Sequence, residues 1–157
     1  MATEENKFLA REILKFPNTG DYSEMDERVS EDFVYRSANG EEYHGRDGFK
    51  ELLSKYRDAF PDLEFTPKEV IAEGDTVVML QTTRGTHRGQ LMDIPPSGNE
   101  VTLPIMSRLK FRDGKLVDLY EIFDSMDMMR QIGALGEEAA PSMPQRESRR
   151  GEGRPRV

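Results

Sequence analysis

The second half of the chain constrains the fold most, because it is a run of strand-like segments joined by tight turns. These segments are rich in β-branched and aromatic residues and span residues 63–65, 70–72, 77–86, 101–111 and 116–123. Two turn signals, Glu73-Gly74-Asp75 and Asp113-Gly114, are short enough to join neighbouring strands as hairpins. The sequence therefore predicts an antiparallel meander.

Helical patterns dominate the first half. Residues 6–15 place Phe8, Leu9, Ile13 and Leu14 at helical spacing. A stronger amphipathic helix is predicted to begin at a capping Asp47, and its broad apolar face consists of Phe49, Leu52, Leu53, Tyr56 and Phe60. Helices followed by a meander indicate an α+β fold with the helices on one face of the sheet. A strongly curved sheet of this kind leaves a concave, apolar cleft, which is where small molecules usually bind.

Length and charge narrow the possible functions. The 157 residues fit one domain, which we place at residues 1–136, followed by a Pro/Arg/Gly-rich tail at 137–157 that we expect to be disordered. The net charge is -8, and residues 141–157 alone carry +3, so the remainder carries -11. Such an acidic domain repels phosphate backbones, which argues against a nucleic-acid partner.

The sequence also bears on location and cofactors. No apolar run is long enough to cross a membrane, and the charged N-terminus does not resemble a secretory signal, so we expect a cytoplasmic protein without a membrane partner. The chain has no cysteine, and its two histidines are far apart, so we expect neither a metal site nor another cofactor.

Five short motifs occur in an order and spacing that resemble those of one protein family. They are AEGDTVV at 72–78, GTHRG at 85–89, IPPSG at 94–98, FRDGKLV at 111–117 and QIG at 131–133. Together they resemble the SnoaL-like polyketide cyclases, within the ketosteroid isomerase-like (nuclear-transport-factor-like) superfamily, over residues 45–133. The resemblance implies a cystatin-like cone, in which a strongly curved, mostly antiparallel sheet wraps around N-terminal helices and encloses a pocket. It also implies a homodimer formed through the sheet.

The resemblance implies a catalytic residue as well. In these cyclases a carboxylate on the last strand is the acid/base of an intramolecular aldol ring closure, and counting back from the QIG motif assigns that position to Asp124. Desolvation in an apolar pocket would raise its pKa and make it a stronger base. The alternative is that Asp124 only caps the helical turn beginning near Ser125. Whether Asp124 points into an enclosed cavity distinguishes these two interpretations.

His87 is the second catalytic candidate, as a donor to an oxyanion or as a partner of the carboxylate. Alternatively, it braces the glycine-rich turn at 85–89. Candidate pocket residues are selected by strand parity or by a polar group at an inward position. They are Tyr35, Tyr56, Met79, Gln81, Ser107, Tyr120 and Ile122.

Three functions remain open. The first is cofactor-independent acid/base catalysis, either a ring closure or an isomerisation of lyase or isomerase type, on a small hydrophobic carbonyl compound or polyketide-like ester. The second is hydroxylation or epoxide opening by the same fold. The third is a binding module that retains the cone without catalysis.

Overall fold

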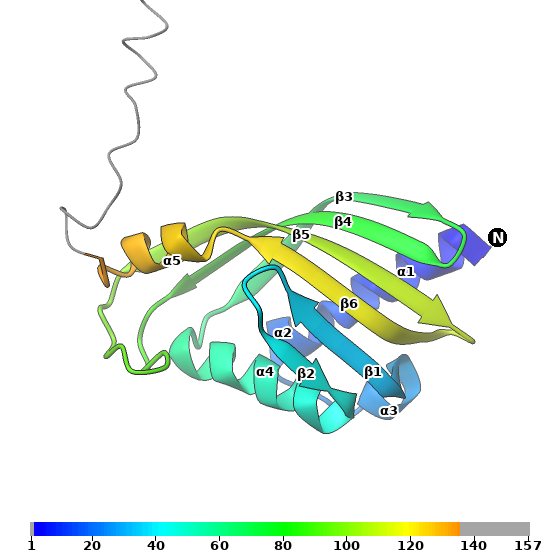
Figure 1. Ribbon diagram of the computed structural model, residues 1–157, viewed down its shortest axis with the longest axis horizontal. Coiled ribbons are helices and arrows are strands. Elements are labelled where there is room, and N and C mark those ends of the chain that lie inside the picture. The colour runs from blue at the N-terminus through cyan, green and yellow to red at the C-terminus, as the bar shows by residue number, and fades with distance from the viewer. Residues whose placement is uncertain (1, 136–157) are drawn as a thin grey trace, which may run out of the picture.

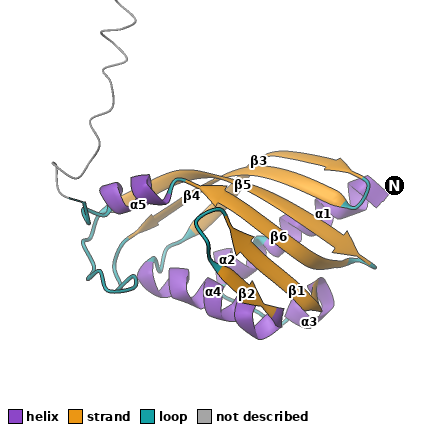
Figure 2. Cartoon of the chain, in the orientation of Figure 1, coloured by secondary structure: helices purple, strands orange, loops and turns teal. Residues whose placement is uncertain are grey.

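A six-stranded sheet curves around one layer of helices (Figures 1 and 2). The computed structural model describes residues 2–135, and the tail predicted at 137–157 lies outside the described residues. The helices are α1 (Ala2–Ile13), α2 (Lys15–Thr19), α3 (Met25–Arg28), α4 (Gly45–Ala59) and α5 (Ser125–Gln131). The strands are β1 (Val29–Ser37), β2 (Glu42–His44), β3 (Glu64–Glu73), β4 (Thr76–Thr86), β5 (Glu100–Arg112) and β6 (Lys115–Phe123).

The strand order is β2-β1-β6-β5-β4-β3. Only the pair β1 and β6 is parallel, and every other neighbouring pair is antiparallel. The long strands β3 to β6 form the meander predicted from the sequence, and the first strand of the chain adds to the sheet beside the last. The predicted α+β fold class, with N-terminal helices against a curved and mostly antiparallel sheet, is confirmed.

Two boundaries differ from the prediction. Helix α4 begins at Gly45, so Asp47 lies in its first turn instead of capping it. Residues 63–65 and 70–72 belong to one ten-residue strand, β3, and not to two. The register of β3 on β4 shifts between Pro67 and Glu69, because proline has no N–H to donate and an irregularity accommodates it.

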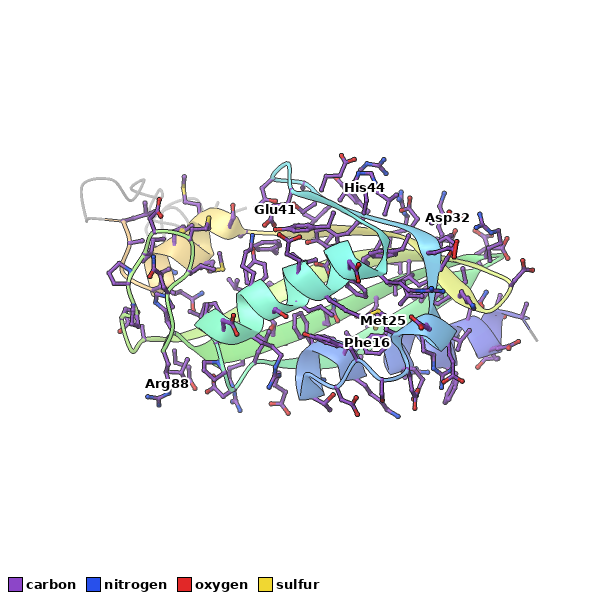
Figure 3. All side chains as sticks on the ribbon, turned by 90° about the horizontal axis from the view of Figure 1, so that it is seen from below. Phe16, Met25, Asp32, Glu41, His44 and Arg88 are labelled. Atoms are coloured by element: carbon purple, nitrogen blue, oxygen red, sulfur yellow. The ribbon has the colours of Figure 1, made fainter. Side chains whose placement is uncertain are left out.

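Regular periodicity explains which side chains are buried. Along β5 the odd-numbered residues from Val101 to Phe111 face inward, and the even-numbered ones between them are exposed or half-buried. On α1 the buried residues Asn6, Leu9, Ala10 and Ile13 follow helical spacing. Figure 3 views the helices with the sheet behind them, and the buried Phe16 and Met25 lie between the two layers. The core therefore occupies the concave side of the sheet.

The outer face of the sheet is also partly apolar. Met106 and Ile122 are directly paired on β5 and β6, and their exposed fractions are 43% and 51%. Ile71 on β3 is exposed as well. Met106 and Ile122 therefore place two exposed apolar side chains side by side on the outer face.

Candidate functional site

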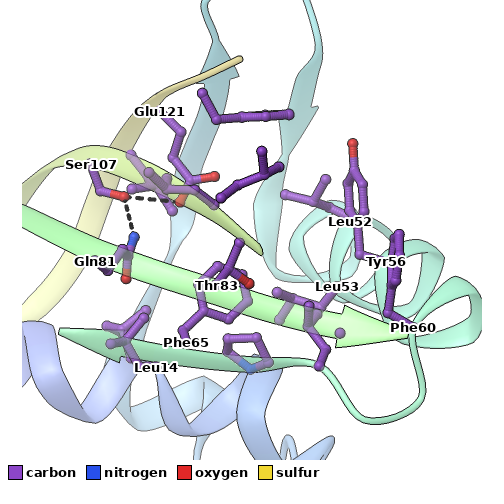
Figure 4. Close-up of a pocket in the computed structure, with 18 of the residues that line it drawn as sticks. Leu14, Leu52, Leu53, Tyr56, Phe60, Phe65, Gln81, Thr83, Ser107 and Glu121 are labelled. Atoms are coloured by element: carbon purple, nitrogen blue, oxygen red, sulfur yellow. Dashed lines mark hydrogen bonds between the residues drawn. The ribbon is translucent and has the colours of Figure 1, made fainter. Parts of the chain in front are cut away.

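An apolar cavity lies between the helices and the inner face of the sheet (Figure 4). Its walls come from α1, α4 and strands β3 to β6, with Tyr35 contributed by β1. The centre of a water molecule can occupy a volume of about 100 Å³ inside this cavity. One water needs about 10–15 Å³ on this measure, so the cavity has room for a small organic molecule.

Glu121 is the only carboxylate among the described residues that line this cavity. Its Oε1 accepts a hydrogen bond of 3.0 Å from the Tyr35 hydroxyl, and its Oε2 accepts one of 3.0 Å from the Ser107 hydroxyl. Ser107 in turn accepts a 2.7 Å hydrogen bond from the Gln81 amide. Figure 4 shows Gln81, Ser107 and Glu121 linked in this order across the wall. These hydrogen bonds fix the position of the Glu121 carboxyl group inside the cavity.

Burial raises the pKa of Glu121 above its ordinary value of 4.5. The hydrogen bonds from Tyr35 and Ser107 lower it in part, and the negative charge of Glu41 raises it further. Burial also raises the pKa of the Tyr35 hydroxyl, with the charge of Glu121 as the next cause. The site therefore combines a carboxyl group that readily holds a proton with a phenol that remains protonated.

A second polar cluster borders the cavity at Tyr56. The Lys55 ammonium pairs with Glu41 at 2.6 Å and donates to the Tyr43 hydroxyl at 3.2 Å. Burial alone would lower the pKa of Lys55, but its hydrogen bonds to Glu41 and Tyr43 raise it overall. The Tyr56 hydroxyl lies 3.4 Å from each Glu41 carboxylate oxygen. These contacts join α4 to the loop between β1 and β2 beside the cavity.

Five of the seven predicted pocket residues lie on the cavity wall, namely Tyr35, Tyr56, Met79, Gln81 and Ser107. Tyr120 and Ile122 do not line it. Tyr120 lies under the Arg108 guanidinium, 5.5 Å from its ring centre, and Ile122 is exposed on the outer face.

A β-bulge determines which side chains of β6 face the cavity. The Asp113-Gly114 hairpin pairs Phe111 with Leu116, but the next pair is Lys110 with Asp118, so Val117 is an extra residue. Beyond this bulge the odd-numbered residues face the cavity. Glu121 is therefore opposite Ser107, where an unbroken hairpin would place Tyr120.

Asp124 lies outside the cavity wall and is exposed. It is the N-cap of α5, and its side chain accepts a 2.9 Å hydrogen bond from the Asp127 backbone N–H. This is the capping arrangement that the sequence analysis gave as the alternative. The carboxylate of the last strand that does enter the cavity is Glu121, three residues earlier.

His87 is fully buried but does not line the cavity. Its Nδ1 accepts from the Ser97 backbone N–H at 3.1 Å, so Nε2 carries the proton. Its ring packs against Phe60 with the ring centres 5.5 Å apart, and burial lowers its pKa. These contacts hold His87 and Ser97 together in the loop between β4 and β5. They fit the alternative in which His87 braces the glycine-rich turn at 85–89.

Glu121 was not among the residues predicted from the sequence, although one feature of the sequence indicates its inward position. Leu116 and Leu119 are both apolar and three residues apart, which breaks strict alternation and is typical of a bulged strand. With Leu119 inward, parity brings Glu121 inward as well. Within residues 2–135, no three histidine or acidic side chains are arranged to hold a metal ion, and no helix is long and apolar enough to cross a membrane.

The fold and cavity define a class of small α+β proteins that enclose a ligand-sized pocket with one carboxyl group in its wall. The family model for SnoaL-like polyketide cyclases matches residues 7–132, and the chain belongs to this family. The comparison with curated proteins gives no match.

Solved structures share the fold of this chain. A proposed SnoaL-like polyketide cyclase from Jannaschia sp. CCS1 is 21% identical with a TM-score of 0.77, covering 85% of this chain and 95% of that one. AclR, a proposed hydroxylase from Streptomyces galilaeus, is 28% identical with a TM-score of 0.76, covering 96% and 91%. An M. tuberculosis epoxide hydrolase of the LEH-like type is 17% identical with a TM-score of 0.68, covering 84% and 92%.

Proposed function

We propose that the protein catalyses cofactor-independent acid/base chemistry on a small apolar carbonyl compound, such as a polyketide-like ketone or β-keto ester. The observation that carries this proposal is Glu121, a single carboxyl group held by Tyr35 and Ser107 in the wall of a mostly apolar cavity. A carboxylate with a raised pKa is a stronger base at neutral pH than an exposed one.

The proposed first step is removal of a proton from the carbon next to the carbonyl. The C–H bond breaks, its electron pair forms the enolate, and the proton goes to Glu121. A neutral carboxyl group needs its hydrogen-bond donors less than a carboxylate does, so Tyr35 becomes able to donate to the enolate oxygen. The enolate carbon then attacks a second carbonyl of the same molecule and closes a ring, the C=O π electrons of that carbonyl form an alkoxide, and Glu121 returns its proton to the alkoxide oxygen. In an isomerisation, Glu121 instead returns the proton to a different carbon.

Hydroxylation or epoxide opening is the second candidate. AclR, which is described as a proposed hydroxylase, shares 28% identity with this chain over nearly its whole length. The same carboxylate could activate a water molecule against an electrophilic carbon. The binding module is the third possibility, and it predicts affinity without turnover.

The first experiment incubates the wild-type protein in deuterium oxide with β-keto esters and bicyclic ketones, and with a cyclic epoxide in parallel. We expect NMR to detect deuterium incorporation at the carbon next to the carbonyl. Asp124→Asn should exchange within about twofold of wild type, because asparagine also caps a helix and the residue is outside the cavity. Diol formation without exchange would favour the hydrolytic candidate, and binding without either reaction would favour the module.

We also propose that two copies pair through the outer face of the sheet, where Met106 and Ile122 are exposed side by side. Arg108 and Asp118 lie on the same two strands, β5 and β6, and are joined by a 2.8 Å ion pair. They would form part of a polar rim. Wild type should sediment at twice 18.0 kDa, and Ile122→Lys at the monomer mass. Phe8→Lys, which changes an exposed apolar residue on α1, should remain dimeric. A monomeric wild type would contradict the proposal.

A further inference from the structure

Two buried polar atoms on the cavity wall have no hydrogen-bond partner. They are Oε1 of Gln81 and Oγ1 of Thr83, and the two residues are 1% and 7% exposed. Both side chains line the cavity and belong to β4, where they are two residues apart and therefore on the same face. An unpaired polar atom at such depth destabilises the folded protein, which makes two of them in one ligand-sized cavity informative.

The hydrogen-bond chain to Glu121 determines which Gln81 atom is left free. When Glu121 is ionised, as the proposed base must be, the Ser107 hydroxyl donates its one proton to that carboxylate, so it can only accept from Gln81. The Gln81 amide nitrogen must therefore face Ser107, and its oxygen is left without a donor. Thr83 adds a hydroxyl that can donate or accept.

The partners of these two residues on β5 are apolar. Gln81 is directly paired with Ile105 on β5, and Thr83 with Leu103. Met79 precedes them on the same face of β4. Figure 4 shows Thr83 beyond Gln81 along this strand, on the side away from Ser107. The two unpaired atoms are thus polar groups on a mostly apolar part of the wall, next to the hydrogen bonds that link Gln81 through Ser107 to Glu121.

We propose that Gln81 and Thr83 form a hydroxyl-binding subsite, so the ligand is a hydroxylated carbonyl compound, such as a phenol or alcohol fused to a cyclic ketone. A hydroxyl group can donate to Gln81 Oε1 and accept from Thr83 Oγ1 at the same time. A bare hydrocarbon edge would leave both atoms unpaired, and an ether could accept but not donate. This inference deepens the proposed function, on which the carbonyl part of the ligand rests.

The test compares three matched probes by isothermal titration calorimetry, namely 1-tetralone, 6-hydroxy-1-tetralone and 6-methoxy-1-tetralone. Wild type should bind the hydroxy compound about tenfold or more tightly than 1-tetralone. An analogue without the hydroxyl leaves the buried polar atoms of Gln81 and Thr83 unpaired. The methoxy compound should not recover this preference. Thr83→Val should reduce the preference severalfold.

Thr82→Val is the matched control, since Thr82 is adjacent in sequence but on the opposite face of β4. It should keep the wild-type ratio of affinities. Thr83→Val should melt no lower than wild type, because the removed hydroxyl has no partner to lose. A purely structural role for Thr83 would change the affinity for all three probes equally and leave their ratio unchanged.

The result separates this inference from the proposed function. Deuterium exchange without a preference for the hydroxy probe would overturn the subsite and leave the acid/base proposal standing. A preference that depends on Thr83, without exchange, would support the subsite and count against the catalysis. Failure of wild type to bind any of the probes at millimolar concentration would overturn the subsite for this ligand class.

Discussion

Glu121→Gln is expected to reduce deuterium exchange at the carbon next to the ketone by about a thousandfold. Glutamine has nearly the same shape as glutamate, and its amide oxygen can still accept from Tyr35 or Ser107. It cannot take a proton from carbon, so the base is lost while the cavity keeps its form. The measurement is the pseudo-first-order exchange rate by NMR, with circular dichroism to show that the variant is folded.

The control is Asp124→Asn, which makes the same carboxylate-to-amide change three residues away. The wall position and hydrogen bonds of Glu121, against the exposed capping role of Asp124, predict opposite outcomes for the two variants. A large loss of exchange in Asp124→Asn with normal exchange in Glu121→Gln would overturn the assignment and restore the prediction made from sequence.

The same substitution has a second, pH-dependent consequence. The pKa of Glu121 is raised in the folded protein, so between pH 4.5 and this raised value the folded state holds more protons than the unfolded state. The free energy of unfolding contributed by this group therefore falls as pH rises through that window. Urea denaturation should find Glu121→Gln gaining stability relative to wild type from pH 4.5 upwards. Exchange by wild type should rise over the same window, as Glu121 loses its proton.

Much of the architecture could be predicted from local patterns. The alternation along β5 and the helical spacing in α4 depend on neighbouring residues, so both were readable from the sequence. Ser107 and Gln81 were identified as candidate pocket residues because each is a polar residue at an inward position of a strand. Their link through a hydrogen bond depends on the pairing of β4 with β5 and needed the structure.

The acid/base candidate was missed for a physical reason. One extra residue, Val117, reverses the facing of every side chain after it in β6. Asp124 was instead assigned by counting back from the QIG motif, and strict alternation from Asp124 placed Tyr120 and Ile122 inward, on the parity opposite to that of Glu121. The resemblance implied a carboxylate on the last strand, and the carboxylate of β6 that lines the cavity is Glu121.

The glycine-rich run at 85–89 illustrates a different limit of sequence patterns. It helped to indicate the family, but the pattern did not say what its glycines contact. A Cβ on Gly85 would lie 2.9 Å from the Cβ of Phe60, and the Gly89 position abuts the backbone of Asp58 at the end of α4. Both glycines therefore allow the end of β4 and the loop after it to pack closely on the C-terminal end of α4.

Gly89→Ala is accordingly expected to destabilise the protein by about 3 kcal/mol. The new methyl group would overlap the Asp58 carbonyl oxygen, which is backbone and cannot rotate away. Moving the loop would break the 3.0 Å hydrogen bonds that the Arg88 and Gly89 N–H groups donate to the Ala59 carbonyl oxygen. Phe60, which follows at the cavity wall, would shift with it. Urea denaturation gives the free energy of unfolding directly.

Gly48→Ala is the matched control, because it adds the same methyl group within α4. Its nearest neighbour would be 3.4 Å away, an ordinary contact distance, and alanine favours a helix over glycine by about 1 kcal/mol. This variant should therefore be as stable as wild type or more so. If Gly89→Ala were as stable as wild type, the loop could move away from α4 without a loss of stability. The close packing of residues 85–89 on that helix would then not hold this end of the cavity in place. A loss confined to Gly89→Ala would instead tie the glycine of the family motif to the shape of the pocket, since the same backbone contact positions Phe60.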